Sequence, residues 1–324
     1  MKVVHYDNPG PPEVMKLIEK EIPKPGNDEI LVKVRSAGVN RPDLIQREGN
    51  YPPPKGHSEI LGLEISGVIS KIGKDVKKFK VNDKVAALVD GGGYAEYCIT
   101  NERQTFLIPK NLSFEEASGI PECFFTVWSN LVNRGNLKKN QKVLVHGGTS
   151  GIGLAALQTL KLFNATTITT VGSAKKKEFC EKIGVDLVIN YNECDFFEEI
   201  KKNEIGNVDM ILDYIGGDYI SKNLNLLKND GSLINIGFQK GSKVELNLIK
   251  VMLKRLVITG STLRIRESSF KGKILEELQK NVFPNFENRK IKCYIDSVFK
   301  LEDVVEAHKR LDEKKHIGKV ILNI

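Results

Sequence analysis

The sequence lacks the cysteine patterns that build disulfide frameworks or cysteine-rich metal sites. Its 324 residues include five cysteines, an odd and widely scattered set with no C-x-x-C pair. They are Cys98, Cys123, Cys180, Cys194 and Cys293. Such spacing is typical neither of a secreted disulfide scaffold nor of a structural zinc site.

Long apolar runs are also missing. No stretch approaches the roughly 18 residues of a membrane span. The first residues, Met1–His5, form a short strand-like run that soon meets Asp7 and Pro9, which is not the pattern of a secretory signal. We therefore expect a cytoplasmic protein with no membrane partner. The composition, 40% hydrophobic and 28% charged, is globular, and the length favours about two domains.

The charge balance is basic, with a formal net charge of +8 and a pI of about 9.0. A basic chain can bind nucleic acid. Here acidic residues are interleaved with the lysines, and no groove of aromatic and basic residues is evident. A lysine-rich solvated surface is the favoured interpretation, and no nucleic-acid partner is expected.

The first ~120 residues predict a β-rich domain. Strands are expected at Glu29–Arg35, Lys84–Leu88 and Tyr94–Thr100, and short strands punctuated by glycines within Leu61–Val76. A helix is then expected after Ser113, because Ser113 and Glu116 have the spacing of a capping box.

From Gln141 onward, strands and helices alternate. Helices are expected at Leu154–Phe163 and Lys175–Ile183. The expected strands are Lys142–His146, Thr166–Val171, Leu187–Asn190, Asp209–Leu212, Ser232–Ile236 and Val257–Gly260. This βαβα rhythm predicts a doubly wound parallel sheet. The last ~60 residues leave the rhythm and end in a strand, Lys319–Leu322, which we expect to complete the first domain.

The strongest motif is Lys142–Gly153, KVLVHGGTSGIG. A strand leads into a turn of small residues and then a helix, which is the arrangement that binds a pyrophosphate at a helix N-terminus. Aligned to G-x-G-x-x-G, the three positions are Gly148, Ser150 and Gly153, and Gly151 adds a further glycine. The pattern predicts a dinucleotide site. A P-loop is excluded because Leu154 follows the last glycine.

The end of the second strand favours NADPH over NADH. An NAD site typically carries an acidic residue there, on the ribose hydroxyls. This chain has Gly172, Ser173 and then three lysines, with no acid before Glu178. Ser173 and Lys176 would suit a 2′-phosphate, which a carboxylate would repel. The alternative is that the lysines only solvate a helix start.

Over essentially its whole length, the sequence resembles the medium-chain dehydrogenase/reductase superfamily. Zinc alcohol dehydrogenases of that superfamily carry a Gly-His-Glu motif followed by spaced glycines. Here Gly62–Glu64 reads GLE, so Leu63 stands where the ligand histidine would be. The catalytic cysteine is absent too, because Ala37–Asn40 reads AGVN. Without imidazole or thiolate ligands, no metal is expected.

Within the superfamily, the sequence resembles the zeta-crystallin-like quinone oxidoreductases. The matching motifs are Gly38–Asp43, Gln46–Pro52, Gly91–Glu96, Ile120–Glu122 with Thr126, Gly172-Ser173, Asp213–Gly217 and Ile317–Lys319. Tyr51–Pro54 and Arg264–Arg266 further resemble the animal type that is induced by a tumour suppressor. The resemblance implies a GroES-like β-rich catalytic domain, residues 1–122 and 265–324. It also implies a Rossmann NADPH-binding domain, residues 123–264.

The resemblance places Asn40 and Tyr51 in the substrate cleft. Asn40 would donate a hydrogen bond to a substrate carbonyl, and Tyr51 would stack on a quinone ring or donate its hydroxyl. The alternatives are an Asx turn before Pro42 for Asn40, and a packing role for Tyr51 beside its proline run. We expect Asp43 to cap a helix, and His146 to satisfy a local hydrogen bond.

The resemblance also implies the residues that contact the cofactor, and a homodimer joined along the strand near Val257–Thr262. The cofactor contacts are Thr126, Gly148, Ser150, Gly151, Ile152, Gly153, Gly172, Ser173, Lys176, Tyr191, Ile215, Gly237, Phe238 and Leu263.

The reaction implied is hydride transfer from NADPH to a quinone. A quinone delocalises the developing negative charge itself, so it can be reduced without a metal Lewis acid. The same chemistry suits an α,β-unsaturated ketone or aldehyde, which is the first alternative. A second alternative, of another class, is an NADPH-regulated RNA-binding or structural protein.

Overall fold

The computed structural model describes residues 1–324. It divides into two compact units: Met1–Phe125 with Leu263–Ile324 is unit 1, and Thr126–Thr262 is unit 2. The sequence interpretation drew the boundaries at 122/123 and 264/265. Leu263 therefore belongs to unit 1 and not to the dinucleotide domain in which it was expected.

Unit 1 is built mainly from β-strands, with six α-helices around them. Its strands are β1 (Lys2–His5), β2 (Lys16–Glu19), β3 (Glu29–Val39), β4 (Glu64–Ile72), β5 (Lys84–Leu88), β6 (Tyr97–Asn101), β7 (Thr105–Leu107), β14 (Ile295–Lys300) and β15 (Lys319–Asn323). Its helices are α1 (Arg41–Arg47), α2 (Phe114–Ser118), α3 (Pro121–Val127, which runs on into unit 2), α9 (Ser268–Asn281), α10 (Phe283–Glu287) and α11 (Val304–Asp312).

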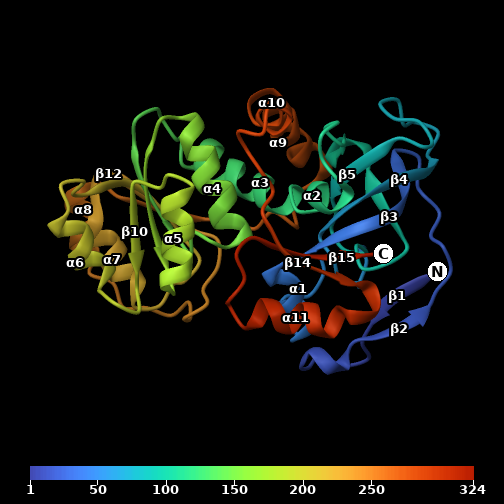
Figure 1. The fold of residues 1–324 in the computed structure, drawn as a ribbon, viewed down its shortest axis with the longest axis horizontal. Coiled ribbons are helices and arrows are strands. Elements are labelled where there is room, and N and C mark those ends of the chain that lie inside the picture. The colour runs from blue at the N-terminus through green and yellow to red at the C-terminus, as the bar shows by residue number, and fades with distance from the viewer. The chain divides into compact units, whose positions relative to one another are not determined.

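The sheet of unit 1 is closed by the end of the chain. Its order is β14-β15-β3-β4-β5-β7, and β6 also pairs with β3. β15 lies antiparallel to β3, with Ile321 opposite Gly38, as Figure 1 shows for the red and blue strands. The expected return of the C-terminal strand to the first domain is confirmed.

One expectation in this unit was wrong. The glycines within Leu61–Val76 were expected to separate short strands, but Glu64–Ile72 forms the single nine-residue strand β4. Gly67 marks a close approach between strands rather than a turn, because a Cβ there would lie 2.2 Å from the carbonyl oxygen of Lys33 on β3. The expected capping box does form: the amide of Glu116 donates to Ser113 Oγ at 3.2 Å.

Unit 2 is a six-stranded parallel sheet flanked by helices. Its strands are β8 (Lys142–His146), β9 (Thr166–Val171), β10 (Leu187–Asn190), β11 (Val208–Asp213), β12 (Leu227–Asn235) and β13 (Val257–Gly260). Its helices are the π-helix η3 (Trp128–Arg134), α4 (Gly151–Leu162), α5 (Ala174–Lys182), α6 (Phe196–Lys202), α7 (Tyr219–Leu226) and α8 (Leu248–Lys254).

No helix of the protein combines the length and the apolar character that a membrane span needs.

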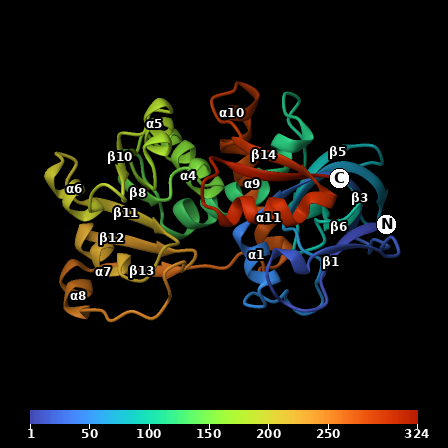
Figure 2. The ribbon, with the colours of Figure 1, turned by 60° about the horizontal axis from the view of Figure 1, so that its bottom comes forward.

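The strand order in unit 2 is β10-β9-β8-β11-β12-β13, with every neighbouring pair parallel. Counted within the unit this is the order 3-2-1-4-5-6 of a Rossmann fold, whose ligands bind where the order reverses, at the carboxyl ends of the strands. β8 lies at that reversal, with β9 on one side and β11 on the other. Figure 2 shows β11, β12 and β13 side by side, with β13 at the edge.

Candidate functional site

A tight glycine turn follows the first strand of unit 2. β8 ends at His146 and α4 begins at Gly151. Between them, Gly147 has a φ of +69°, which glycine adopts without strain. Ser150 caps the helix, because its Oγ accepts a hydrogen bond of 2.9 Å from the amide of Gly153. The turn therefore directs the first amides of α4 toward the carboxyl end of the sheet.

Two positions of the glycine pattern have no room for a side chain. A Cβ on Gly148 would lie 2.3 Å from Thr169 Oγ1, and one on Gly153 would lie 2.3 Å from the carbonyl oxygen of Gly147. The turn is thus drawn close to β9 and to its own helix. This is the close approach that lets a backbone reach a pyrophosphate.

A second loop braces the glycine turn. The hydroxyl of Tyr214, just after β11, lies 3.1 Å from both the Gly147 carbonyl oxygen and Ser150 Oγ. The buried carboxylate of Asp213 accepts a 2.7 Å hydrogen bond from the amide of Ile215 and so fixes the start of this loop. The motif drew attention to Asp213–Gly217, but sequence reasoning did not find the bracing role of Tyr214.

The loop after β11 continues past two glycines before the next helix, α7, starts at Tyr219. Gly216 and Gly217 have φ values of +68° and +55°, which no right-handed helix contains. Ile215 therefore lies on a loop at the carboxyl end of β11.

The end of β9 carries a hydroxyl where NAD-type sites carry an acid. Ser173 caps α5, and its Oγ accepts a hydrogen bond of 3.3 Å from the amide of Lys176. A Cβ on Gly172 would lie 2.4 Å from the hydroxyl of Tyr191, which follows β10. Gly172, Ser173, Lys176 and Tyr191 thus gather at the ends of the neighbouring strands β9 and β10.

The other predicted cofactor residues are spread more widely. Thr126 is in α3 and Ile152 is in the first turn of α4. Gly237 and Phe238 follow β12, and the Phe238 side chain is exposed. Leu263 lies in unit 1. The turn, the capped helix and the strand ends of unit 2 fit a dinucleotide by their own geometry.

A buried ion pair organises the predicted substrate residues of unit 1. Lys319 Nζ lies 2.6 Å from Glu64 Oε1, and both side chains are almost fully buried. Asn40 joins the pair: its Nδ2 donates to Glu64 Oε1 at 2.9 Å, and its Oδ1 accepts from Lys319 at 2.6 Å. Gly38 makes room for this carboxylate, because a Cβ there would lie 2.0 Å from Glu64 Oε1.

The amide of Asn40 is thus occupied by the protein itself. Its second contact from Nδ2 goes to the carbonyl oxygen of Gly38 at 3.3 Å. In this arrangement Asn40 positions charged groups and has no amide hydrogen left for a substrate carbonyl. In the backbone, Asn40 is the N-cap residue of helix α1.

Glu122 contacts the Glu64–Lys319 ion pair through its backbone. Its amide donates to Glu64 Oε2 at 2.8 Å, whereas its own carboxyl group, partly buried, has no hydrogen-bond partner within the chain. Burial, and after it the nearby charge of Glu64, raise the pKa of Glu122 to about 8. The sequence motif included Glu122, but nothing in the pattern assigned it a role.

Tyr51 lies against a cation. The guanidinium carbon of Arg264 is 5.6 Å from the centre of the Tyr51 ring. Arg264 is held by Gln46 Oε1 at 2.7 Å and by the carbonyl oxygen of Asp90 at 2.9 Å. Burial is the main cause that raises the pKa of Tyr51, and the charge of Glu122 adds to it. The Tyr51 ring is therefore packed against the Arg264 guanidinium.

The position of the zinc ligand is apolar. Leu63 is buried, and Glu64 beside it is committed to Lys319. No three His, Cys, Asp or Glu side chains of the chain are grouped so as to hold a metal ion.

Two other sequence predictions are confirmed. The Asp43 carboxylate caps α1 by accepting from the amide of Asn40 at 2.8 Å. His146 is fully buried, with Nδ1 3.0 Å from Thr170 Oγ1 and Nε2 2.9 Å from Asn223 Oδ1. Both ring nitrogens are thus occupied, which is a structural arrangement.

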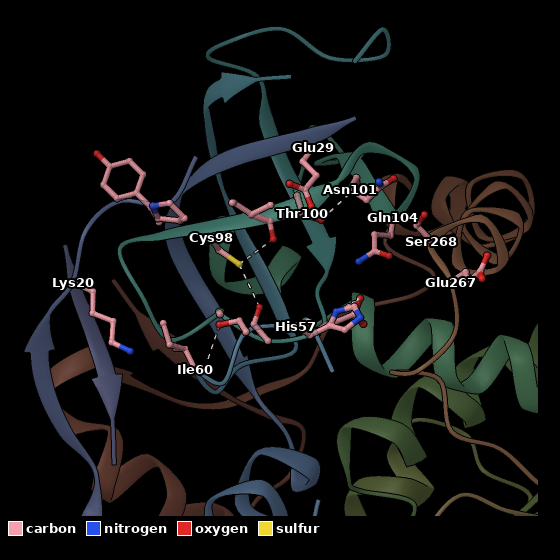
Figure 3. Close-up of a pocket in the computed structure, with 18 of the residues that line it drawn as sticks. Lys20, Glu29, His57, Ile60, Cys98, Thr100, Asn101, Gln104, Glu267 and Ser268 are labelled. Carbon is pink, nitrogen blue, oxygen red and sulfur yellow. Dashed lines mark hydrogen bonds and ion pairs between the residues drawn. The ribbon is translucent and has the colours of Figure 1, made fainter. Parts of the chain in front are cut away.

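Unit 1 also contains a polar pocket of about 720 Å³ (Figure 3). His57, whose Nδ1 lies 3.6 Å from Asp90 Oδ2, and the buried Cys98 both line it. Neither Asn40 nor Tyr51 lines this pocket. It is therefore separate from the residues that the sequence singled out for substrate.

Both halves of the chain match known families. A model described as "Alcohol dehydrogenase GroES-like domain" matches residues 26–110. A model described as "Zinc-binding dehydrogenase" matches residues 151–280.

Curated relatives resemble the chain over nearly its full length. A synaptic vesicle membrane protein VAT-1 homolog of Danio rerio is 33% identical over 319 residues, which are 94% of this chain and 66% of the relative. The chain thus spans about two thirds of that relative's length. The quinone oxidoreductase of Homo sapiens is 30% identical over 315 residues, or 96% of this chain and 94% of the relative.

Solved structures resemble this fold over the full length of the chain. The quinone oxidoreductase of Escherichia coli in complex with NADPH is 28% identical, with a TM-score of 0.89 over 100% of both chains. A structure named an NAD-dependent alcohol dehydrogenase is 29% identical, with a TM-score of 0.88 and the same coverage.

The chain belongs to the medium-chain dehydrogenase/reductase superfamily, and it is consistent with the zeta-crystallin-like quinone oxidoreductase type. These likenesses support an oxidoreductase that uses a nicotinamide cofactor and acts on a small molecule.

The buried ion pair yields a stability prediction. Replacing Lys319 by Met leaves the Glu64 carboxylate buried without its cation, so we expect a loss of about 3–5 kcal/mol in the free energy of unfolding. The double variant Glu64→Gln/Lys319→Met removes both charges and should recover most of that loss. Urea unfolding measures both. Lys315→Met, at an exposed position, is the matched control, expected within about 0.5 kcal/mol of wild type. A Lys319→Met effect as small as the control's would contradict the prediction.

Proposed function

We propose that the protein is a zinc-independent NADPH:quinone oxidoreductase. The observation that carries the proposal is the replacement of the ligand histidine by the buried Leu63, beside a Glu64 already paired with Lys319. An acceptor that spreads its own negative charge, such as a quinone, suits a site of this composition. The quinone oxidoreductases among the relatives support the same acceptor class.

In the proposed reaction, NADPH supplies a hydride when it is bound. The turn at Gly147–Gly153 and the N-terminus of α4 would hold its pyrophosphate. Ser173 and Lys176 would hold its 2′-phosphate. The Tyr51 ring, backed by Arg264, would pack against the flat quinone. Asn40 would keep the Glu64–Lys319 pair in place beneath that site. A cytoplasmic location is part of the proposal, on the grounds of the sequence alone.

The activity test is NADPH oxidation with 9,10-phenanthrenequinone or 1,2-naphthoquinone in the presence of a metal chelator. We expect turnover that the chelator does not reduce, and higher kcat/KM with NADPH than with NADH. Absorbance at the nicotinamide band measures both. Turnover confined to α,β-unsaturated ketones would move the acceptor class to enones, and loss of turnover with chelator would refute the zinc-free mechanism.

The cofactor preference can be reversed at one position. Ser173→Asp keeps a side chain that caps α5 but adds a carboxylate that repels a 2′-phosphate. We expect NADPH to bind at least roughly tenfold more weakly, a change of about 1.4 kcal/mol, while NADH binding changes little. Titration calorimetry measures both constants. Ser173→Asn, of the same shape without the charge, is the matched control. Equal weakening of both cofactors in Ser173→Asp would argue against a phosphate contact.

We further propose a homodimer joined along β13. This strand is the edge of the unit 2 sheet, where an unpaired strand can add to a second copy. Exposed apolar side chains gather on β13 and on α8 before it: Leu248, Ile249, Met252, Leu253, Val257 and Ile258. Isolated apolar residues are common on surfaces, but a contiguous group marks a contact site.

Ile258→Lys should convert the dimer to a monomer, because the new charge would have to be buried in the interface. Light scattering after size-exclusion chromatography measures the mass. Val298→Lys, at another exposed strand position, is the control and should stay dimeric. A wild-type protein that is monomeric at tens of micromolar would overturn the dimer.

A further inference from the structure

A buried hydrogen-bond network connects two loops at the carboxyl end of the unit 2 sheet. One loop is the glycine turn after β8, which begins at Gly147, and the other is the loop after β11, which begins at Tyr214. The side chains between them are almost fully buried: His146, Thr170, Asp213 and Asn223. All of them belong to unit 2, so the network can be followed within one compact part of the chain.

The direction of the hydrogen bonds follows from Asp213, whose carboxylate only accepts. Four N–H groups donate to it: the backbone amides of Ile215 and Gly216 and the side-chain amides of Asn223 and Asn235. Asn223 therefore turns its Nδ2 toward Asp213, at 3.2 Å, and its Oδ1 toward His146 Nε2, at 2.9 Å. Because this amide oxygen also only accepts, His146 carries a hydrogen on Nε2.

The other ring nitrogen of His146 accepts. Burial lowers the pKa of His146 from its ordinary value of 6.5, against the opposing charge of Asp213, so the ring is neutral at pH 7. Its Nδ1 then takes the hydroxyl hydrogen of Thr170, whose Oγ1 lies 3.0 Å away. The same Oγ1 accepts from the amide of Gly147 at 3.3 Å. The chain of hydrogen bonds thus runs from the glycine turn to the start of the other loop.

The imidazole ring is also held in place by packing. Phe196 on α6 and Tyr219 on α7 contact it in edge-to-face arrangements, with ring centroids 5.0 and 4.9 Å away. The titratable groups that face His146 are Asp213 on β11 and Tyr219. A ring confined in this way cannot turn toward one partner without losing the other, so its two hydrogen bonds form together.

We propose that His146 is a positioning residue that couples the glycine turn to the loop after β11. Its side chain is fully buried, so it acts through Thr170 on the turn and through Asn223 on the loop. The loop in turn contacts the glycine turn directly, because the Tyr214 hydroxyl lies 3.1 Å from the carbonyl oxygen of Gly147. The inference rests on the proposed function, since it takes the glycine turn as the place where the dinucleotide binds.

The first test measures NADPH binding by titration calorimetry in variants that break one hydrogen bond of the chain. Thr170→Val keeps the shape of the side chain but leaves the Gly147 amide and His146 Nδ1 without their partner. We expect it to weaken NADPH binding roughly tenfold. Thr170→Ser restores the hydroxyl and should bind as wild type. Thr159→Val is the matched control, because Thr159 is equally buried and its hydroxyl has no hydrogen-bond partner.

His146→Phe breaks the same chain at its centre. Phenylalanine fills the space beside Phe196 and Tyr219 but neither donates nor accepts a hydrogen bond. We expect it to weaken NADPH binding about as much as Thr170→Val does. The double variant should bind no more weakly than either single variant, because both changes interrupt one pathway. Losses that add would show that the two residues act separately, and they would overturn the coupling.

Amide hydrogen exchange, measured by NMR without cofactor, follows the coupling across the network. In Thr170→Val we expect faster exchange at Gly147, which loses its acceptor, and also at Ile215 and Gly216 on the far side of the network. A purely local role of Thr170 would change Gly147 alone, and that result would contradict the proposal. Thr159→Val should exchange as wild type at all three amides.

The outcomes separate this inference from the proposed function. Wild type that binds neither NADPH nor NADH overturns the dinucleotide site and the inference with it. Wild type that binds NADPH no better than Thr170→Val and His146→Phe do overturns the inference alone. If His146→Phe does not fold, Thr170→Val and Thr170→Ser decide: equal binding overturns the inference, and a roughly tenfold difference supports it.

Discussion

The ion pair between Glu64 and Lys319 holds together parts of the chain that are about 255 residues apart. A buried charge is costly unless an opposite charge and hydrogen bonds compensate it. Here Lys319 donates to Glu64, to Asn40 and to the carbonyl oxygen of Val39. When β15 pairs with β3, it supplies the cation that compensates Glu64, and it also satisfies the backbone hydrogen-bonding groups of β3. Asn40 and Glu122 both contact the same Glu64 carboxylate.

The Glu64–Lys319 pair also affects the pKa of the neighbouring Glu122. Burial, and after it the nearby carboxylate of Glu64, make a negative charge at Glu122 unfavourable and raise the pKa of Glu122. The cation of Lys319 lowers the pKa of Glu122, but burial and Glu64 outweigh it.

Much of this arrangement was predictable because it depends on local patterns. Five of the six strands of unit 2 were predicted to within a residue at each end, since each apolar run is bounded by glycine or polar residues and the alternation with helices is regular. The exception is β12, which starts at Leu227 and not at the predicted Ser232. Gly67 misled the prediction: a glycine in a strand signals a turn or a close approach equally well, and only the neighbouring strand β3 decides between them. Leu263 was assigned to the wrong unit, because its position depends on contacts that no local pattern records.

The functional roles within unit 1 show where sequence reasoning stops. Glu64, Glu122 and Lys319 each appear in recognisable motifs, but their meaning lies in contacts across the fold. Asn40 illustrates the difference, because its residue type suggests a hydrogen-bond donor for substrate, whereas both sides of its amide are taken up by the ion pair. Leu63 is buried and apolar, and the fixed charges beside it are a lysine from the last strand and Glu64 from β4, with glycine at Gly38 leaving the space.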